Sequence, residues 1–307
     1  MLFRSQPQKA MDETGESPLT WVWHDAGNAA RIGLSPQMAN RVMIRPSGST
    51  ESRLVNLPLE TGIVPLLLDD LLIIAGSGGD VAIASAKDGS PQGQPFVPDY
   101  EKTTPWKWQA MVGLQDKSII LADDSGRLIR LVSEGMPAKP RQTARVTLEG
   151  KFSGTLVSTG RAILALQSGG TVISLAGRDL TTQATWTFPG PGTRLYPLGG
   201  SKALVCHPSG LIRLVDESGQ TQAETKLAGV MPTSSPVIGN GQVAWLTQNK
   251  QSELVVWKIS EPEPSRIPLQ TWVQGPVFQG ESGWLVVERP GVLRQISVAG
   301  SLIEKKP

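Results

Sequence analysis

The chain of 307 residues has few side chains that could act as a general base beside a nucleophile. His24 and His207 are its only histidines. A serine or cysteine nucleophile needs such a base within hydrogen-bonding reach, and the sequence contains no G-x-S-x-G nucleophile elbow. His24 falls in the least regular part of the chain, and His207 falls in a predicted hairpin turn. We therefore predict structural or solvent-facing roles for both histidines, no catalytic residue and no enzymatic activity.

Metal binding is not favoured by the arrangement of potential ligands. The one cysteine, Cys206, precedes His207 in a predicted strand, so their side chains are expected on opposite faces and not around one zinc ion. The acidic turns 123–126 and 216–219 lack the spaced ligands and the closing glutamate of a calcium loop. Asp and Ser in such turns hydrogen-bond their own backbone. We predict no metal site.

The segment Gly239-Asn-Gly-Gln-Val-Ala244 matches G-x-G-x-x-A, a phosphate-binding pattern when it opens a helix. Here a β-rich run, 243–247, follows it. The sequence therefore predicts a hairpin turn, and no cofactor-binding residue is assigned.

Aromatic residues gather around one proline-rich segment, 91–105. The chain has nine tryptophans, and most are expected to fill space between sheets. The exceptions form a candidate partner-binding loop, because aromatic side chains on a protruding loop can anchor a protein partner. The alternative is a loop folded back over the edge of a sheet. The candidate residues are Phe96, Tyr100, Trp106 and Trp108.

Composition narrows the class of protein and of partner. The chain is 39% hydrophobic and 18% charged, with a formal net charge of +2, which is ordinary for a globular protein. No run of Lys or Arg could follow a phosphate backbone, so nucleic acid is not a predicted partner. The most apolar window, 64–75, contains Asp69 and Asp70 and is shorter than the ~20 residues of a membrane span. No membrane span is predicted.

A repeated two-strand pattern organises the chain. Leu-Ile-Arg-Leu-Val begins at Leu128 and again at Leu211, 83 positions later, each time after an apolar run and a turn containing Ser-Gly. The spacing is about twice the ~40–45 residues of a propeller repeat. Similar turns lie 31, 47, 44, 40, 42 and 39 residues apart. Their anchor residues are Gly48, Gly79, Gly126, Gly170, Gly210, Ser252 and Gly291.

This period, without helical spacing, predicts an all-β fold, a β-propeller of about seven four-stranded blades. Eight blades, or an incomplete propeller from a longer chain, are the alternatives. The inner strands are expected to be nearly continuous apolar runs, because neighbouring blades cover both of their faces. We expect a flexible N-terminal tail or linker at 1–18, which shows no secretory signal core, and a single propeller domain at 19–307.

Two stretches, Gly160–Gly177 and Ser234–Thr247, resemble PQQ-like, or quinoprotein-like, repeats, in which Ser-Pro-Val leads to a strand, a glycine turn and a second strand. The resemblance covers roughly 66–306. It implies a seven- or eight-bladed propeller of the non-enzymatic branch, similar to the scaffold propeller of the outer-membrane assembly machinery. It also implies an extracytoplasmic or periplasmic location, although no signal peptide is visible.

These observations favour a non-catalytic scaffold that binds a protein partner. We expect a monomer without a cofactor. A PQQ-dependent oxidoreductase-like propeller and a carbohydrate-binding module are the alternative functions. The enzyme branch carries tryptophan-docking repeats, and in this chain the matching turns, such as 216–219, have no tryptophan at a fixed offset.

Overall fold

The computed structural model is built from antiparallel sheets, and the residues it describes contain no helix. None of these residues therefore forms a helix that could cross a membrane. The described residues are 8–10, 19–25, 31–46, 49, 51–99, 106–134, 138–198, 201–227, 231–248, 251–271, 273, 277–280, 282–288, 292–297 and 302–303.

Two compact units divide the chain, one formed by 1–154 with 178–180 and the other by 155–177 with 181–307. A single propeller domain over 19–307 stays a prediction. Of the predicted tail, 1–7 and 11–18 lie outside the described residues. Gln8–Ala10 forms a short strand that pairs with the next one, so these three residues belong to a sheet.

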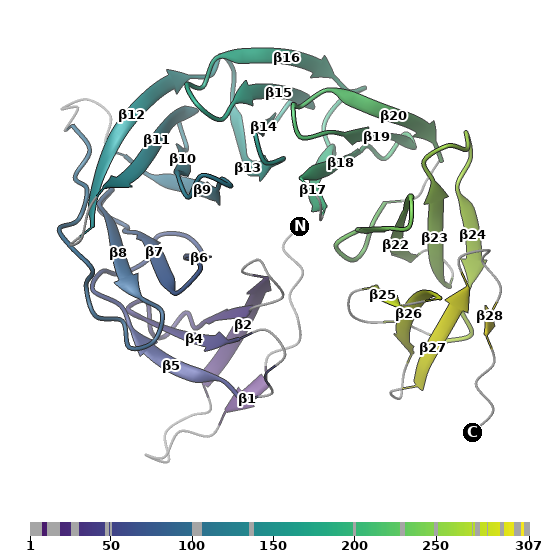
Figure 1. Cartoon of the computed structure of the whole chain (residues 1–307), viewed down its shortest axis with the longest axis horizontal. Coiled ribbons are helices and arrows are strands. Elements are labelled where there is room, and N and C mark those ends of the chain that lie inside the picture. Colours follow the sequence, from purple (N-terminus) through teal and green to yellow (C-terminus); the bar gives the residue numbers. More distant parts are fainter. Residues whose placement is uncertain are drawn as a thin grey trace. The chain divides into compact units, whose positions relative to one another are not determined.

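The first unit contains three sheets (Figure 1). The first sheet has the order β1-β2-β3-β4-β5: β1 (Gln8–Ala10), β2 (Leu19–Asp25), β3 (Arg31–Leu34), β4 (Arg41–Arg45) and β5 (Arg53–Asn56). The second is β6-β7-β8: β6 (Leu66–Leu68), β7 (Leu71–Ala75) and β8 (Val81–Ser85). The third is β12-β11-β10-β9: β9 (Trp108–Gly113), β10 (Ile119–Asp123), β11 (Arg127–Glu134) and β12 (Lys139–Thr147).

Four more sheets follow, each with four strands in chain order. The chain passes from the first unit to the second within β13. These strands are β13 (Phe152–Ser158), β14 (Ala162–Gln167), β15 (Thr171–Ala176) and β16 (Thr182–Thr187); β17 (Arg194–Leu198), β18 (Lys202–Cys206), β19 (Leu211–Val215) and β20 (Thr221–Lys226); β21 (Val237–Gly239), β22 (Gln242–Gln248), β23 (Ser252–Lys258) and β24 (Ser265–Pro268); β25 (Phe278–Gly280), β26 (Gly283–Glu288), β27 (Val292–Ser297) and β28 (Leu302–Ile303).

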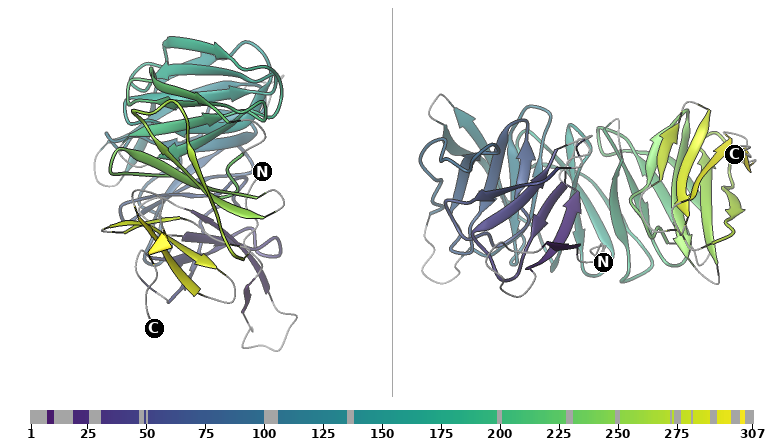
Figure 2. Two further views of the ribbon diagram at one scale, coloured as in Figure 1. Left: turned by 90° about the vertical axis from the view of Figure 1, so that its right-hand side faces the viewer. Right: turned by 90° about the horizontal axis from the view of Figure 1, so that it is seen from below.

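Apolar side chains form the core between neighbouring sheets within each unit. In the first unit, one cluster joins Ile32 and Ile44 to Leu72 and Ile74. In the second, Trp245 and Trp257 pack with residues of β18 and β19, and Trp284 packs with residues of β22 and β23. Figure 2 shows β21–β24 and β25–β28 as neighbouring layers.

Several inner strands are buried along most of their length, as predicted from their nearly continuous apolar runs. All five residues of β10 are buried, and so are the first five of β14. A strand with both faces covered cannot alternate apolar and polar side chains without burying the polar ones. The apolar runs therefore indicate layers of sheets.

The predicted turn anchors occupy one structural position in four successive sheets. Gly79, Gly126, Gly170 and Gly210 all have positive φ, between 80° and 96°, in the turn between the second and third strands. Glycine adopts this conformation without the steric cost that a Cβ atom brings. The glycines that recur in the sequence therefore mark a backbone conformation that recurs in these four sheets.

Three of the outer strands share a second repeated feature, a β-bulge. The register shifts after Arg130, Ser174 and Leu214, leaving one extra residue on β12, β16 and β20. A bulge increases the local twist and turns the edge of a sheet away from other strands. These three outer edges are therefore poor templates for pairing with another chain.

Candidate functional site

The proline-rich segment forms the outer edge of the β6–β8 sheet. The N–H and C=O of Val81 both hydrogen-bond to Phe96, and Gln92 N donates to Ile83 O at 2.9 Å. Ala138 N donates to Gln92 O at 2.6 Å on the other side. Residues 91–99 thus fill the place of a fourth strand, and prolines at 91, 95 and 98 keep them from forming a regular one. Of the two arrangements considered from the sequence, the described part of this segment matches the folded-back loop.

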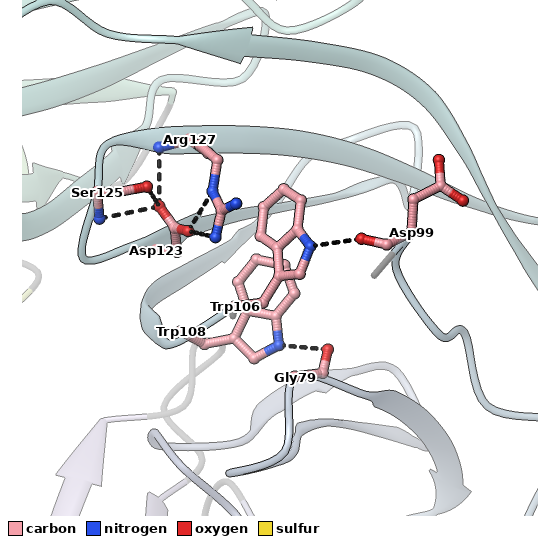
Figure 3. Close-up of polar contacts among 7 residues, drawn as sticks. All are labelled: Gly79, Asp99, Trp106, Trp108, Asp123, Ser125 and Arg127. Carbon is pink, nitrogen blue, oxygen red and sulfur yellow. Dashed lines mark hydrogen bonds and ion pairs between the residues drawn. The ribbon is translucent and has the colours of Figure 1, made fainter. Parts of the chain in front are cut away.

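The two tryptophans that follow this segment are buried, not protruding. Trp106 and Trp108 are 5% and 4% exposed, and their rings lie 5.1 Å apart at 32°. Trp106 Nε1 donates to Asp99 O at 3.2 Å, and Trp108 Nε1 donates to Gly79 O at 2.8 Å (Figure 3). Tyr100 lies outside the described residues. The indoles therefore hold the loop and the β7–β8 turn in place.

Asp123, at the end of β10, forms a buried ion pair with Arg127, at the start of β11. Asp123 Oδ2 accepts from Arg127 Nε at 2.6 Å and lies 2.5 Å from Nη2. Asp123 Oδ1 accepts from the backbone N–H and hydroxyl of Ser125 and from Arg127 N (Figure 3). Burial of a charged pair is tolerated only when the remaining lone pairs are satisfied, and here both carboxylate oxygens are fully engaged.

The guanidinium of Arg127 completes the arrangement by stacking on Trp106. Its central carbon lies 3.9 Å from the ring centroid, and that of Arg145 lies 5.2 Å away. Cations at such distances are attracted by the negative face of the indole. We call Trp106, Trp108, Asp123 and Arg127 the aromatic clasp. It connects the turns of two neighbouring sheets of the first unit.

Gly79 shows how closely the aromatic clasp is packed. Its φ is 96°, and a Cβ atom at this position would lie 3.1 Å from Trp106 Cβ. A side chain at this turn would therefore face both backbone strain and close contact with Trp106.

The chemistry of the aromatic clasp is that of a structural anchor. A general base needs a lone pair that can face a substrate, and both oxygens of Asp123 already accept hydrogen bonds within the fold. The turn chemistry of Asp123 was predictable from the sequence, but the role of Arg127 was not. The sequence signal for a buried arginine was its position directly after a Ser-Gly turn, between two apolar runs.

The exposed residues of the segment include apolar ones, Pro95 and Val97, beside the polar Gln94 and Asp99. Val97 is 65% exposed, the highest value among the large exposed hydrophobic residues, and Pro95 is also exposed. Phe96, between them, is half-buried and packs against the core cluster that contains both indoles. A backbone that is hydrogen-bonded to β8 therefore presents Pro95 and Val97, while Phe96 packs inward.

The second unit places His207 and Cys206 in structural positions. His207 is buried in the β18–β19 turn, where Nδ1 accepts from Ser209 N at 3.0 Å and lies 2.8 Å from Ser209 Oγ. Cys206 is fully buried, and burial raises the pKa of its thiol. His24 lies in β2. No cluster of three potential metal ligands occurs in the part of the chain that the structure describes.

The G-x-G-x-x-A segment forms the predicted hairpin turn. Gly239 pairs with Gln242 across β21 and β22, and the two residues between them have φ values of 52° and 71°. Positive φ at both central positions is typical of the type I′ turn that Asn-Gly favours. The residues that follow directly, 242–248, form β22 and not a helix whose backbone N–H groups could bind a phosphate.

Comparisons with known proteins identify the fold. BamB from Moraxella catarrhalis is 12% identical, with a TM-score of 0.53, over 91% of this chain and 88% of that one. Sqt1 from Saccharomyces cerevisiae is 10% identical, with a TM-score of 0.60, over 92% and 83%. BBS1N, solved in complex with ARL6DN, is 15% identical, with a TM-score of 0.54, over 97% and 99%. No family model and no curated protein matches the sequence.

These similarities, together with the repeated antiparallel sheets, show that the chain has a β-propeller fold. Seven sheets are described, in agreement with the predicted blade number. Five have four strands, the first has five because β1 is added, and β6–β8 has three because the proline-rich segment replaces its outer strand.

Proposed function

We propose that the protein is a non-catalytic β-propeller scaffold that binds a protein partner through the proline-rich segment. The observation that carries this proposal is the difference in exposure between neighbouring residues of 91–99. Val97 is 65% exposed, while Phe96 and the aromatic clasp fix the backbone below it. An apolar side chain on an already ordered backbone loses little conformational entropy on binding. Its burial in a partner would contribute favourable free energy.

The solved relatives support an interaction role without specifying it. BBS1N was solved in complex with ARL6DN, which is a precedent for a similar fold in a protein complex. We also propose that the chain belongs to the PQQ-like repeats. The order of Ser-Pro-Val at 235–237, β21, the Asn-Gly turn and β22 supports this proposal. We further propose an extracytoplasmic monomer, to be tested by cell fractionation and light scattering.

The test is co-purification of a partner with the full chain from an extract of the source organism. Val97→Asp places a charge on the exposed apolar position without removing a buried group. Lys151→Gln, at an exposed position of the same unit, is the control. We expect Val97→Asp to reduce partner recovery about tenfold, with an unchanged unfolding midpoint and full recovery by the control. Equal recovery by all three proteins would remove 91–99 from the interface.

A further inference from the structure

Exposure alternates from one residue to the next near the end of the proline-rich segment. Within 95–99, Phe96 is half-buried, Pro98 is buried and the other three residues are exposed. The N–H and C=O of Phe96 both hydrogen-bond to Val81 at 2.8 Å, so the backbone runs here like a strand. Side chains alternate between the two sides of such a backbone. The exposed residues therefore share the side opposite Phe96, and we call them the exposed strip: Pro95, Val97 and Asp99.

The two-residue spacing of the exposed strip determines how a partner can contact it. Pro95 and Pro98 form a P-x-x-P pattern, and such segments bind aromatic grooves as polyproline II helices with about three residues per turn. In that conformation the two prolines would share one face, whereas here Pro95 is exposed and Pro98 is buried. A strand-like backbone instead places successive side chains of the strip about 7 Å apart. An extended partner segment has the same spacing.

Asp99 gives the exposed strip a negatively charged end. Its C=O accepts the hydrogen bond of the Trp106 indole, and Figure 3 shows its carboxylate directed away from the aromatic clasp. Arg127 and Arg145 both lie on the Trp106 ring. In the described part of the chain, neither of them is paired with Asp99, and the Asp99 carboxylate has no hydrogen bond or ion pair. A carboxylate beside two exposed apolar side chains is complementary to a ligand that is partly apolar and basic.

We propose that the exposed strip binds an extended partner segment whose alternate residues are apolar, apolar and basic. The two apolar side chains cover Pro95 and Val97, and the Lys or Arg forms an ion pair with Asp99. Removal of Val97 from water supplies favourable free energy, and the ion pair selects the partner by charge. The proposal rests on the proposed function, because it specifies the chemistry of the partner that binds 91–99.

The probes are three short fluorescent peptides in which serines alternate with Leu, Leu and a third residue. That third residue is Lys, Gln or Glu. Binding to the full chain is followed by fluorescence anisotropy at low and at high salt. We expect the Lys peptide to bind about threefold more tightly than the Gln peptide, because an exposed ion pair contributes little. The Glu peptide should bind least, and salt should reduce these differences.

Variants of the chain separate the charge of the exposed strip from its apolar part. Asp99→Asn should remove most of the difference between the Lys and Glu peptides, and Asp99→Lys should reverse their order. Asp124 is an exposed aspartate of the same unit outside the strip, so Asp124→Asn is the matched control and should bind like the wild type. Val97→Ser should weaken all three peptides about tenfold.

Two kinds of result would overturn the proposal, and they differ in what they say about the scaffold function. Equal binding of the Lys and Glu peptides, or the same preference in the wild type and in both Asp99 variants, would overturn the charge preference alone. The co-purification test with Val97→Asp would be unaffected. Failure of the Lys peptide to bind the wild type, or its unchanged binding to Val97→Ser, would remove the exposed strip from the interface and count against the proposed function as well.

Discussion

At the scale of single residues, the ion pair between Asp123 and Arg127 is the feature most sensitive to substitution. Asp123→Asn would leave the guanidinium of Arg127 buried without its counter-charge. Breaking a buried pair from one side costs about 3–5 kcal/mol. We expect a loss of this order in the free energy of unfolding, measured by chemical denaturation with tryptophan fluorescence.

An exposed ion pair in the same unit provides the matched control for this prediction. Arg141 Nη2 and Glu134 Oε1 lie 2.7 Å apart with both side chains largely exposed. Exposed pairs contribute about 0–1 kcal/mol, so Arg141→Gln should change stability little. Similar losses for Asp123→Asn and Arg141→Gln would contradict a structural role for the aromatic clasp.

Cys206 gives a second residue-scale prediction. Its thiol is fully buried, and burial raises its pKa, so the reactive thiolate is disfavoured at neutral pH. The test is a thiol titration with an aromatic disulfide that releases a coloured thiolate on reaction. We expect no reactive thiol in the native chain and one after unfolding. Rapid reaction of the native protein would show that β18 is accessible to solvent.

The turn at Asp216 predicts a contribution to stability that depends on pH. Burial opposes ionisation of Asp216, but hydrogen bonds from Ser218 and Gln220 outweigh it and lower the pKa below the usual 3.8. A carboxyl with a lower pKa in the folded state stabilises the fold above pH 3.8 and loses this contribution as pH falls through the folded pKa. Asp216→Asn should therefore unfold with a weaker pH dependence below pH 3.8 in acid titrations followed by circular dichroism. An unchanged slope would contradict it.

At the scale of elements, two adjacent glycines differ in whether the fold requires glycine at their position. Gly170 has a φ of 90°, and a Cβ atom there would lie 2.2 Å from Gly190 O. A Cβ atom at Gly169 would meet nothing within 4 Å. Gly170→Ala should cost about 2 kcal/mol or more, whereas Gly169→Ala should be nearly neutral in the same denaturation assay. Equal effects would contradict the proposed role of the turn anchors.

The sequence predicted these turns well because glycine and Asx residues act through local geometry. It could not show where 91–99 would lie, because that position depends on hydrogen bonds to Val81 and Ile83 and on the burial of both indoles. A substitution of Trp106 or Trp108 by alanine would therefore disturb the fold. Val97 is the better position at which to examine binding.

The repeated Leu-Ile-Arg-Leu-Val is one residue out of step with the structural repeat. Ala122 pairs with Leu128, whereas Cys206 pairs with Ile212, so the equivalent positions are 84 residues apart and not 83. His207 takes the place of Asp123 at the start of the turn, and both accept a hydrogen bond from a serine N–H two residues on. Because a one-residue shift moves a side chain to the other face, the arginines of the two copies are not equivalent.

At the scale of the whole molecule, the spacing of the repeats was sufficient to predict the fold class and the number of sheets. The period reflects a physical requirement, since each apolar sheet face must be covered by another sheet. The candidate site was less predictable, because exposure of Val97 and burial of Arg127 are properties of packing.

Site-specific cross-linking tests the proposed scaffold function most directly. A photoreactive amino acid is introduced at position 97, with position 151 as the control, and adducts are identified by mass spectrometry after irradiation in cells of the source organism. The account predicts a single protein adduct at position 97 that is absent at position 151. An identical adduct pattern at both positions, or none at position 97, would contradict a partner-binding role for this segment.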